Sequence, residues 1–218
     1  MDNTQITEKT ISFVKQTLKD AEGGHDWFHI QRVFKNAMLI AKDYPQASPL
    51  VVALGALLHD IADSKFHKGD ETVGGKMAED FLTSLSVEPN VITQVVAIID
   101  NISFRGGNFK QTFRSIELDI VQDADRLDAI GAIGIARCFN YGGFKNRKLY
   151  DPAISPNLQM TKEEYKKSTA PTINHFYEKL LLLKDRMNTD TGKKLAQRRH
   201  EFMELFLEQF YAEIDGER

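Results

Sequence analysis

Apolar residues recur at intervals of three and four along almost the whole chain, which is the spacing of amphipathic helices rather than of strands. No stretch alternates convincingly enough to predict a strand, and the chain contains no internal repeat. The pattern therefore predicts an all-α fold. A first helix is expected to end before Gly23, and further helices are expected over residues 27–44, 48–58, 72–85, 89–103, 115–142, 165–187 and 192–214.

The third predicted helix differs from the others because it is apolar on every side. Ser48 and Pro49 form an N-cap and first-turn signature, and nearly every residue from there to His59 is apolar. A helix of this composition is expected in the protein interior. His59, Asp60 and Asp63 follow at the end of this helix and are therefore expected near the protein interior, where an unpaired charge is costly. These side chains therefore need partners that compensate their charge.

The character of the chain changes near residue 145. Residues 115–142 are apolar almost all round and are expected to form a central helix. Residues 145–160, "KNRKLYDPAISPNLQM", contain two prolines and little periodicity, which predicts a long surface loop. We therefore expect a helical core over residues 1–145 and, over 146–218, a loop and a two-helix extension packed on that core. The last helix carries a predicted buried stripe of Phe202, Leu205, Phe206 and Phe210.

Composition excludes several classes of protein. The 218 residues are 42% hydrophobic and 27% charged, which is typical of a globular chain with one sizeable core or a core and an appendage. The formal net charge of −3 provides no general attraction to nucleic acid. Cys138 is the single cysteine, which excludes a disulfide framework and a cysteine-based zinc site and fits a reducing compartment. With no signal peptide and no apolar run long enough for a bilayer, a soluble cytoplasmic protein is expected.

Four residues from three predicted helices offer the chemistry of a metal site, namely His29, His59, Asp60 and Asp125. Two imidazoles and two carboxylates suit a divalent transition metal better than Ca. Spacing alone cannot establish such a site, because the ligands meet only after folding. Asp123 and Asp128 flank Asp125, and the periodicity of their helix does not select among the three. The second His-Asp pair, His25-Asp26, lies at a helix start and suits capping or substrate contact better.

These residues and their neighbours resemble the HD-domain metal-dependent phosphohydrolase superfamily. The segments that carry the resemblance are "HDWFHIQRV" from residue 25, "LLHDIADSKFH" from residue 57 and "IVQDADRLDAIGAIGIAR" from residue 120. They are most similar to the bacterial nucleotide phosphohydrolase-like subfamily, and the match covers about residues 25–140. The resemblance implies an HD-domain helical bundle with a C-terminal helical extension, and it implies metal ligation by His29, His59, Asp60 and Asp125. Only this family pattern selects Asp125 over its acidic neighbours.

The chain departs from the family pattern in one informative respect. Members with two metals carry further histidines after the His-Asp pair and at the end of the following helix. The corresponding stretches here, "GDETVGGKMAED" and "IIDNISFRG", contain no histidine. We therefore expect one divalent ion, drawn from Mn, Co, Ni, Fe, Zn and Mg with Mn favoured, and we expect water or substrate oxygens in its open positions.

Further polar residues are candidates for catalysis or substrate binding. Asp63 lies one helical turn after Asp60, and in relatives an acid there assists the attacking water; the alternative is an ordinary helix-end acid. His175 and Lys179, four residues apart, could point at the site or lie on the surface, and we favour the surface for both. The candidates for contact with substrate phosphate are Lys65, His67, Lys76 and Arg105, with solvated surface charges as the alternative.

The sequence predicts metal-dependent hydrolysis of a nucleotide phosphoester or phosphoanhydride bond, by a phosphatase of monophosphates or a pyrophosphohydrolase of triphosphates. The expected partner is a small-molecule nucleotide, without a membrane or a stable nucleic-acid partner, and a homodimer is left open. One alternative is cleavage of a cyclic nucleotide or of ppGpp, although the Glu-Asp pair typical of alarmone hydrolases is replaced by Asp63-Ser64. The other is a non-catalytic regulatory module that retains metal, against which the complete ligand set argues.

Overall fold

The computed structural model describes residues 1–21, 26–62, 72–102, 113–161, 164 and 167–217 of the chain. The described residues form helices, turns and irregular segments without a strand, which confirms the predicted all-α fold. They divide into two compact units, of which the first ends at Asp125 and the second begins at Arg126. The predicted division at residue 145 lies further along the chain and stays a prediction. No helix in the described ranges is long and apolar enough to cross a membrane.

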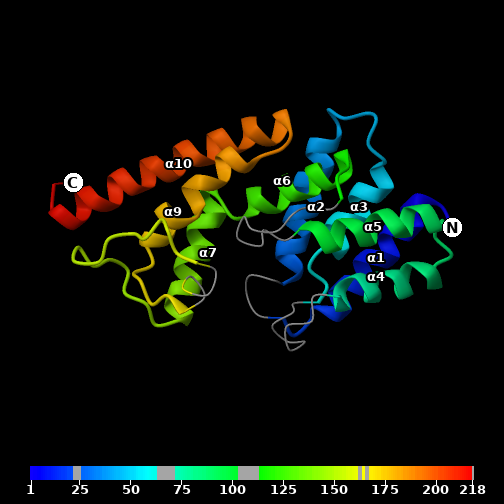
Figure 1. Ribbon diagram of the computed structural model, residues 1–218, viewed down its shortest axis with the longest axis horizontal. Coiled ribbons are helices and arrows are strands. Elements are labelled where there is room, and N and C mark those ends of the chain that lie inside the picture. The colour runs from blue at the N-terminus through cyan, green and yellow to red at the C-terminus, as the bar shows by residue number, and fades with distance from the viewer. Residues whose placement is uncertain (22–25, 63–71, 103–112, 162–163, 165–166, 218) are drawn as a thin grey trace. The chain divides into compact units, whose positions relative to one another are not determined.

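The first unit is built around one buried helix. Its helices are α1 (Asn3–Thr17), α2 (Trp27–Ala41), α3 (Pro49–Leu58), α4 (Val73–Ser84), α5 (Pro89–Ile102) and the part of α6 (Ile116–Asp128) up to Asp125. Figure 1 shows α3 beside α1, α2 and α5, and all three pack against it, while α4 packs against α5. This arrangement gives α3 neighbours on every side.

Helix α3 has the interior position that its composition predicts. Every residue from Val51 to Leu58 is buried. The Ser48 side chain accepts a hydrogen bond from the backbone N–H of Val51, and the Ser48 N–H donates to Glu117 on α6. A Cβ at Gly55 would lie 3.2 Å from an Ile98 methyl of α5, so the absence of a side chain at this position lets the two helices approach closely.

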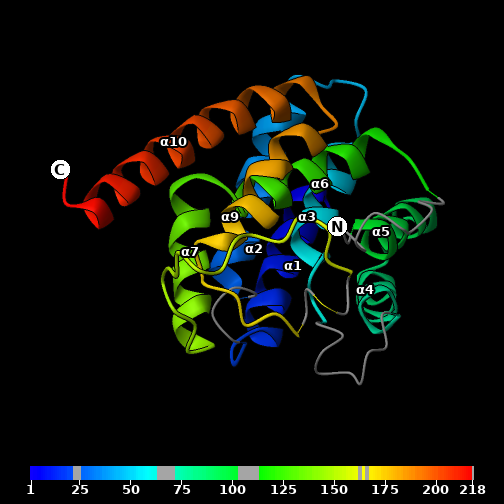
Figure 2. The same cartoon turned by 60° about the vertical axis from the view of Figure 1, so that its left-hand side comes forward.

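The second unit contains α7 (Gly131–Phe144), the short helix α9 (Asn174–Glu178), the 3₁₀ helix η1 (Leu180–Arg186) and α10 (Asp190–Asp215). Helix α10 packs on α7 and η1, and Figure 2 shows α7 and α9 side by side. Aromatic rings join these helices, because Phe176 of α9 stacks on Phe206 of α10 at a centroid distance of 5.7 Å and Phe139 of α7 lies 5.9 Å from Phe206. The loop expected over residues 145–160 is irregular, as predicted.

The single helix predicted over residues 115–142 is wrong, because the chain breaks between α6 and α7. Ile130 is extended, and Gly131 has φ +73°, a left-handed conformation that favours glycine. A Cβ at Gly134 would lie only 2.3 Å from the Ala129 carbonyl oxygen, so this close turn also needs a glycine there. The helical periodicity continues across the break, which is why it did not reveal the turn.

The helix predicted over residues 165–187 is also wrong in the described part of that range. Residues 168–171 are irregular, and only α9 and the 3₁₀ helix η1 follow. Pro171 lacks a backbone N–H and cannot take part in a continuous helix at this point. The short helices therefore begin only after Pro171.

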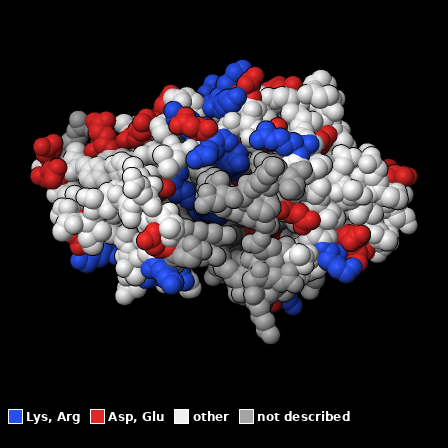
Figure 3. Space-filling model, viewed as in Figure 1, with Lys and Arg blue, Asp and Glu red and all other residues white. Residues whose placement is uncertain are grey.

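The last predicted helix is confirmed as α10, but half of its predicted apolar stripe is wrong. Phe202 and Leu205 are 49% and 61% exposed, whereas the buried residues of this helix are Gly192, Ala196, Met203 and Leu207. The stripe is displaced because the helix packs on α7 and η1 along the line of Met203. Figure 3 shows acidic side chains gathered over the C-terminal half of α10, where the sequence places Glu204, Glu208, Glu213 and Asp215.

Candidate metal centre

The first candidate ligand, His29, is held at the start of α2. The Asp26 carboxylate caps this helix by accepting a hydrogen bond of 2.9 Å from the His29 backbone N–H. The predicted capping role of Asp26 is therefore confirmed, while His25 lies outside the described residues. His29 is only 2% exposed. Its backbone position is set by the cap and its ring is enclosed by the first unit.

The second candidate, His59, is the C-cap residue of α3. Its Nδ1 lies 2.9 Å from the Ala56 carbonyl oxygen. Because a carbonyl oxygen only accepts, Nδ1 must carry the hydrogen, and in the neutral ring Nε2 then carries the lone pair. Metal-ligating histidines commonly donate their second ring N–H to a backbone carbonyl in this way, which fixes the ring orientation.

Both imidazoles converge on Asp125 of α6. The Nε2 atoms of His29 and His59 lie 3.6 and 3.8 Å from Asp125 Oδ1, and the two ring centroids are 5.3 Å apart. One ligand atom from each of the three residues lies within 4.8 Å of both others. The Asp125 side chain is 40% exposed, so solvent reaches the carboxylate while the histidines are covered.

This donor set fits a divalent metal ion. Ligands that share an ion at about 2.0–2.2 Å lie roughly 3.0–3.5 Å from one another, and the separations of 3.6 and 3.8 Å are close to that range. Without a cation, the Nε2 lone pair of His59 would face a carboxylate oxygen, and two acceptors would oppose each other. A proton on one ring would satisfy only one of the two His–Asp pairs, whereas one ion satisfies all three groups.

The remaining acids of the region have different environments. Asp60 lies half-buried in the turn after α3 and is not a member of the group formed by His29, His59 and Asp125. Asp123 is fully buried and is also not a member. Asp128, only 1% exposed, accepts a hydrogen bond of 2.6 Å from Arg137 within the second unit. The structure thus brings together three of the four predicted ligands, and ligation by Asp60 stays a prediction.

Most predicted catalytic and substrate-binding residues cannot be placed. Asp63, Lys65, His67 and Arg105 lie outside the described residues. Lys76 is exposed on α4 and pairs with Asp80, one turn further on, at 3.2 Å. This pair lies on the solvent face of the helix, and substrate contact by Lys76 stays a prediction.

Two further residues differ from their expected settings. His175 is half-buried rather than exposed, and its pKa is lowered to about 3 by burial and, secondarily, by the positive charges of Lys179 and Arg147. Lys179 is half-buried rather than exposed.

Burial raises the pKa of the Cys138 thiol to about 12, and Arg147 offsets this only in part. A thiol with this pKa is not a nucleophile at neutral pH.

Sequence reasoning missed Arg147, whose charge reaches both of these buried groups. The signal was present in the sequence as Lys145, Arg147 and Lys148, three cations within four residues shortly after Gly142-Gly143. The expectation of a surface loop over residues 145–160 gave these cations a solvated role and left them out of the candidate set.

The helices of the first unit bring two histidines and an aspartate together in a group that could hold a metal ion. The HD domain model matches residues 27–130, and the chain belongs to the HD-domain family. It is similar to Bacillus subtilis YpgQ, with 38% identity over 99% of this chain and 97% of YpgQ. It is also similar to the crystal structure of an HD-superfamily hydrolase from Bacillus thuringiensis, with 43% identity, a TM-score of 0.79, and coverage of 98% of this chain and 99% of the other. The structure of B. subtilis YpgQ in complex with ADP superposes with a TM-score of 0.78 at 33% identity and covers 98% of this chain and 97% of YpgQ.

Proposed function

We propose that the protein is a metal-dependent phosphohydrolase that acts on nucleotides. The observation that carries this proposal is the convergence of two buried Nε2 atoms on Asp125 Oδ1, at 3.6 and 3.8 Å. His29, His59 and Asp125 would hold one divalent ion, and Asp60 is proposed as the fourth ligand from the family pattern. The exposed part of Asp125 leaves one side of the site open to a substrate.

A nucleotide is the proposed substrate. B. subtilis YpgQ, a relative that matches nearly the full length of this chain, has been crystallised with ADP, and this supports a nucleoside phosphate as the ligand here. A phosphate group also has the hard oxygen atoms that such an ion accepts in its open positions. The bond cleaved is a phosphoester of a monophosphate or a phosphoanhydride of a triphosphate.

The residues of the chain have separable roles in this proposal. When bound, a divalent ion polarises a phosphoryl oxygen and lowers the pKa of the attacking water. The Ala56 carbonyl keeps the hydrogen of His59 on Nδ1, so the lone pair of Nε2 stays available for ligation. We assign Asp63 as the general base that accepts a proton from the attacking water, on the basis of the family resemblance.

The role of Asp63 leads to a prediction that separates catalysis from ligation. Asp63→Asn keeps the shape of the side chain but removes its basicity, so metal content and melting temperature are expected to stay at wild-type values. Turnover is expected to fall by about 10²–10⁴-fold, the usual contribution of a general base. Elemental analysis, thermal unfolding and kcat on one nucleotide measure the three quantities. Normal turnover at full metal occupancy would make Asp63 a helix-end acid, and loss of metal would make it a ligand.

The function is tested by incubating the Mn²⁺-loaded protein with nucleoside mono-, di- and triphosphates, 3′,5′-cyclic nucleotides and ppGpp, and by resolving phosphate from pyrophosphate among the products. We expect hydrolysis of a mono- or triphosphate that disappears with EDTA and in Asp125→Ala. Cleavage of only the cyclic nucleotides or ppGpp would replace the proposed substrate class. Full metal occupancy without turnover of any of these compounds would favour the regulatory module instead.

A further inference from the structure

The second unit contains a pocket of about 410 Å³ whose wall is basic. It lies where α7 ends and the following loop begins, and residues 168–171 form its other side. The residues that decide its chemistry are Tyr141, Lys145, Arg147, Lys148, Ser168 and Thr169. None of the described residues that line it is Asp or Glu. Three cations and three side chains with hydroxyl groups therefore line one concave surface.

The cations of this pocket are only partly neutralised. Lys148 pairs with Asp151 at 2.8 Å, outside the lining. Arg147 donates to the Ser168 carbonyl oxygen at 2.6 Å, which fixes its guanidinium, and within the described part of the chain it forms no salt bridge with an acid. Lys145 and Arg147 each lie 5.6 Å from the centroid of the Tyr141 ring. An aromatic ring offers such cations a weak attraction but no formal negative charge.

The charge of Arg147 acts on the groups buried around it. It contributes, after burial and Lys179, to the lowered pKa of His175, and it lowers the pKa of Cys138 against the larger effect of burial. Both effects have the sign expected of a positive charge close to the two groups.

The end of α7 does not offset this positive charge. The last carbonyl groups of a helix carry partial negative charge, which disfavours an anion. Here the backbone N–H groups of Lys145, Asn146 and Arg147 donate to the carbonyls of Tyr141, Gly143 and Gly142 at 2.9, 3.0 and 2.9 Å. Because these carbonyl groups already accept hydrogen bonds, the side-chain cations determine the charge that an anion would meet in the pocket.

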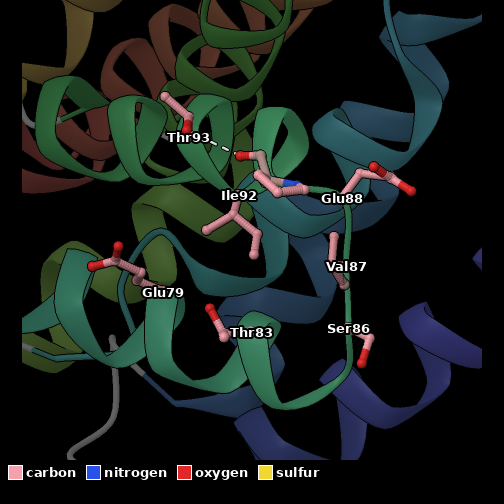
Figure 4. A pocket seen from close by; sticks show the side chains of 8 residues that line it. Glu79, Thr83, Ser86, Val87, Glu88, Ile92 and Thr93 are labelled. Atoms are coloured by element: carbon pink, nitrogen blue, oxygen red, sulfur yellow. Dashed lines mark hydrogen bonds between the residues drawn. The ribbon is translucent and has the colours of Figure 1, made fainter.

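A second pocket of about 410 Å³, in the first unit, shows the opposite character. Figure 4 shows Glu79 and Thr83 on α4 and Ile92 on α5 facing the space between the two helices, and Glu88 also lines it. Its described lining contains no Lys or Arg. The two pockets have similar volume, so charge rather than size distinguishes the one that suits an anion.

We infer that the basic pocket of the second unit binds the phosphate groups of a phosphorylated small molecule. Arg147 provides the planar, fixed donor that phosphate recognition favours, and Lys145 and Lys148 provide charge. The hydroxyl groups of Ser168 and Thr169 can donate to the remaining phosphate oxygens. All these residues belong to the second unit, whereas His29, His59 and Asp125 belong to the first. The residues proposed to bind phosphate are therefore different from the proposed metal ligands.

The test is calorimetric titration of the full-length protein with inorganic pyrophosphate and, separately, with ADP, both in excess EDTA. A charge-assisted hydrogen bond contributes about 1.5–3 kcal/mol, so Arg147→Ala is expected to weaken pyrophosphate binding about 10- to 100-fold. Lys145→Ala removes an exposed cation that makes no described side-chain hydrogen bond, and this variant is expected to weaken pyrophosphate binding several-fold. Thermal unfolding of both variants shows whether the fold is kept, and Lys145→Ala remains informative if Arg147→Ala is destabilised.

Two control variants separate this proposal from a general charge effect and from the metal site. Lys194→Ala removes an exposed cation from α10, outside the pocket, and Asp125→Ala removes a proposed metal ligand; both are expected to keep the wild-type Kd in EDTA. If ADP binds more tightly than pyrophosphate and Tyr141→Ala removes the difference, the ligand is a nucleotide; equal affinities indicate recognition of phosphate alone. Wild-type affinity in both Arg147→Ala and Lys145→Ala, or an equal loss in Lys194→Ala, would overturn the inference.

Discussion

Three acidic residues within two turns of α6 differ in what surrounds them. Asp125 faces two imidazoles, Asp123 is fully buried, and Asp128 is held by Arg137. Hydrophobic periodicity could not separate them, because α6 buries polar side chains such as Asp123 and Asp128 as well as apolar ones. The family resemblance selected Asp125, and the geometry independently places its carboxylate with the histidines.

The first residue-scale prediction follows from these environments. Asp125→Ala removes a carboxylate from the convergence point and is expected to abolish stoichiometric Mn²⁺ binding. Asp123→Asn changes a buried acid outside the group and is expected to retain the metal. Elemental analysis after purification and dialysis measures both, with circular dichroism as the check of folding. Retention of metal by Asp125→Ala together with its loss from Asp123→Asn would show that the wrong carboxylate was chosen.

His175 gives a prediction about pH and stability. Burial, with smaller effects of Lys179 and Arg147, lowers its pKa to about 3, whereas the ordinary value in the unfolded chain is 6.5. Below pH 6.5 the unfolded state therefore binds a proton that the folded state does not. Folding stability is lost as the pH falls from 6.5 towards 3, by up to about 1.4 kcal/mol per pH unit, and no contribution from this group is expected above pH 6.5.

The measurement is urea unfolding of the wild type and of His175→Gln at pH 7.5, 5.5 and 4.5. The glutamine variant lacks the titrating group, so its free energy of unfolding is expected to fall less between pH 7.5 and 4.5 than that of the wild type. The difference isolates His175 from the other histidines. Parallel pH dependences would mean that its ring is protonated in the folded protein.

At the scale of elements, helix starts were predictable and breaks within helical patterns were not. Asp26, Ser48-Pro49 and Pro89 mark starts because caps and first-turn prolines act locally. The break at Gly131 is set by how the chain packs, and the apolar pattern continues across it. Pro171 was a local signal that a helix should not cross, and it was overlooked.

Helix α10 provides the prediction at this scale. Met203 is fully buried and Phe202 is 49% exposed, although they are adjacent. Met203→Ala leaves a cavity and is expected to cost about 2–5 kcal/mol, and Phe202→Ala is expected to cost less than about 1 kcal/mol. Urea unfolding of the two variants measures both. A cost for Phe202→Ala as large as that for Met203→Ala would mean that its ring is covered in solution, for instance by a second copy of the chain.

At the scale of the whole molecule, the candidate site is a product of tertiary structure. His29 comes from the start of α2, His59 from the end of α3 and Asp125 from the last turn of α6. Sequence spacing carries no information about such a meeting, because the distances along the chain reflect intervening helices rather than ligand geometry. The local structure around two of the ligands could still be predicted. The cap at Asp26 sets the position of His29, and the polar end of the apolar helix α3 sets that of His59.

Helix α6 links the two compact units, and this leads to a prediction for unfolding. Leu118, Ile120, Val121 and Ala124 are buried on the side of the first unit, and Leu127 is buried after the boundary at Asp125. Because one helix supplies core residues to both units, we expect a single cooperative thermal transition. Ligand binding to the folded state then stabilises the whole chain, by about 2.7 kcal/mol at a free ligand concentration of 100 times Kd.

Differential scanning calorimetry with and without Mn²⁺ measures this coupling. At 100 times Kd the Tm is expected to rise by roughly 5–11 °C, since about 1 kcal/mol shifts the Tm of a chain of this size by roughly 2–4 °C. Mn²⁺ is preferred to Zn²⁺ or Cu²⁺ because its weaker affinity for nitrogen ligands limits binding to the unfolded chain. His59→Ala, which lacks a ligand, is expected to show no shift. Two transitions in the wild type, of which Mn²⁺ moves only one, would mean that the units unfold independently and that α6 does not couple them.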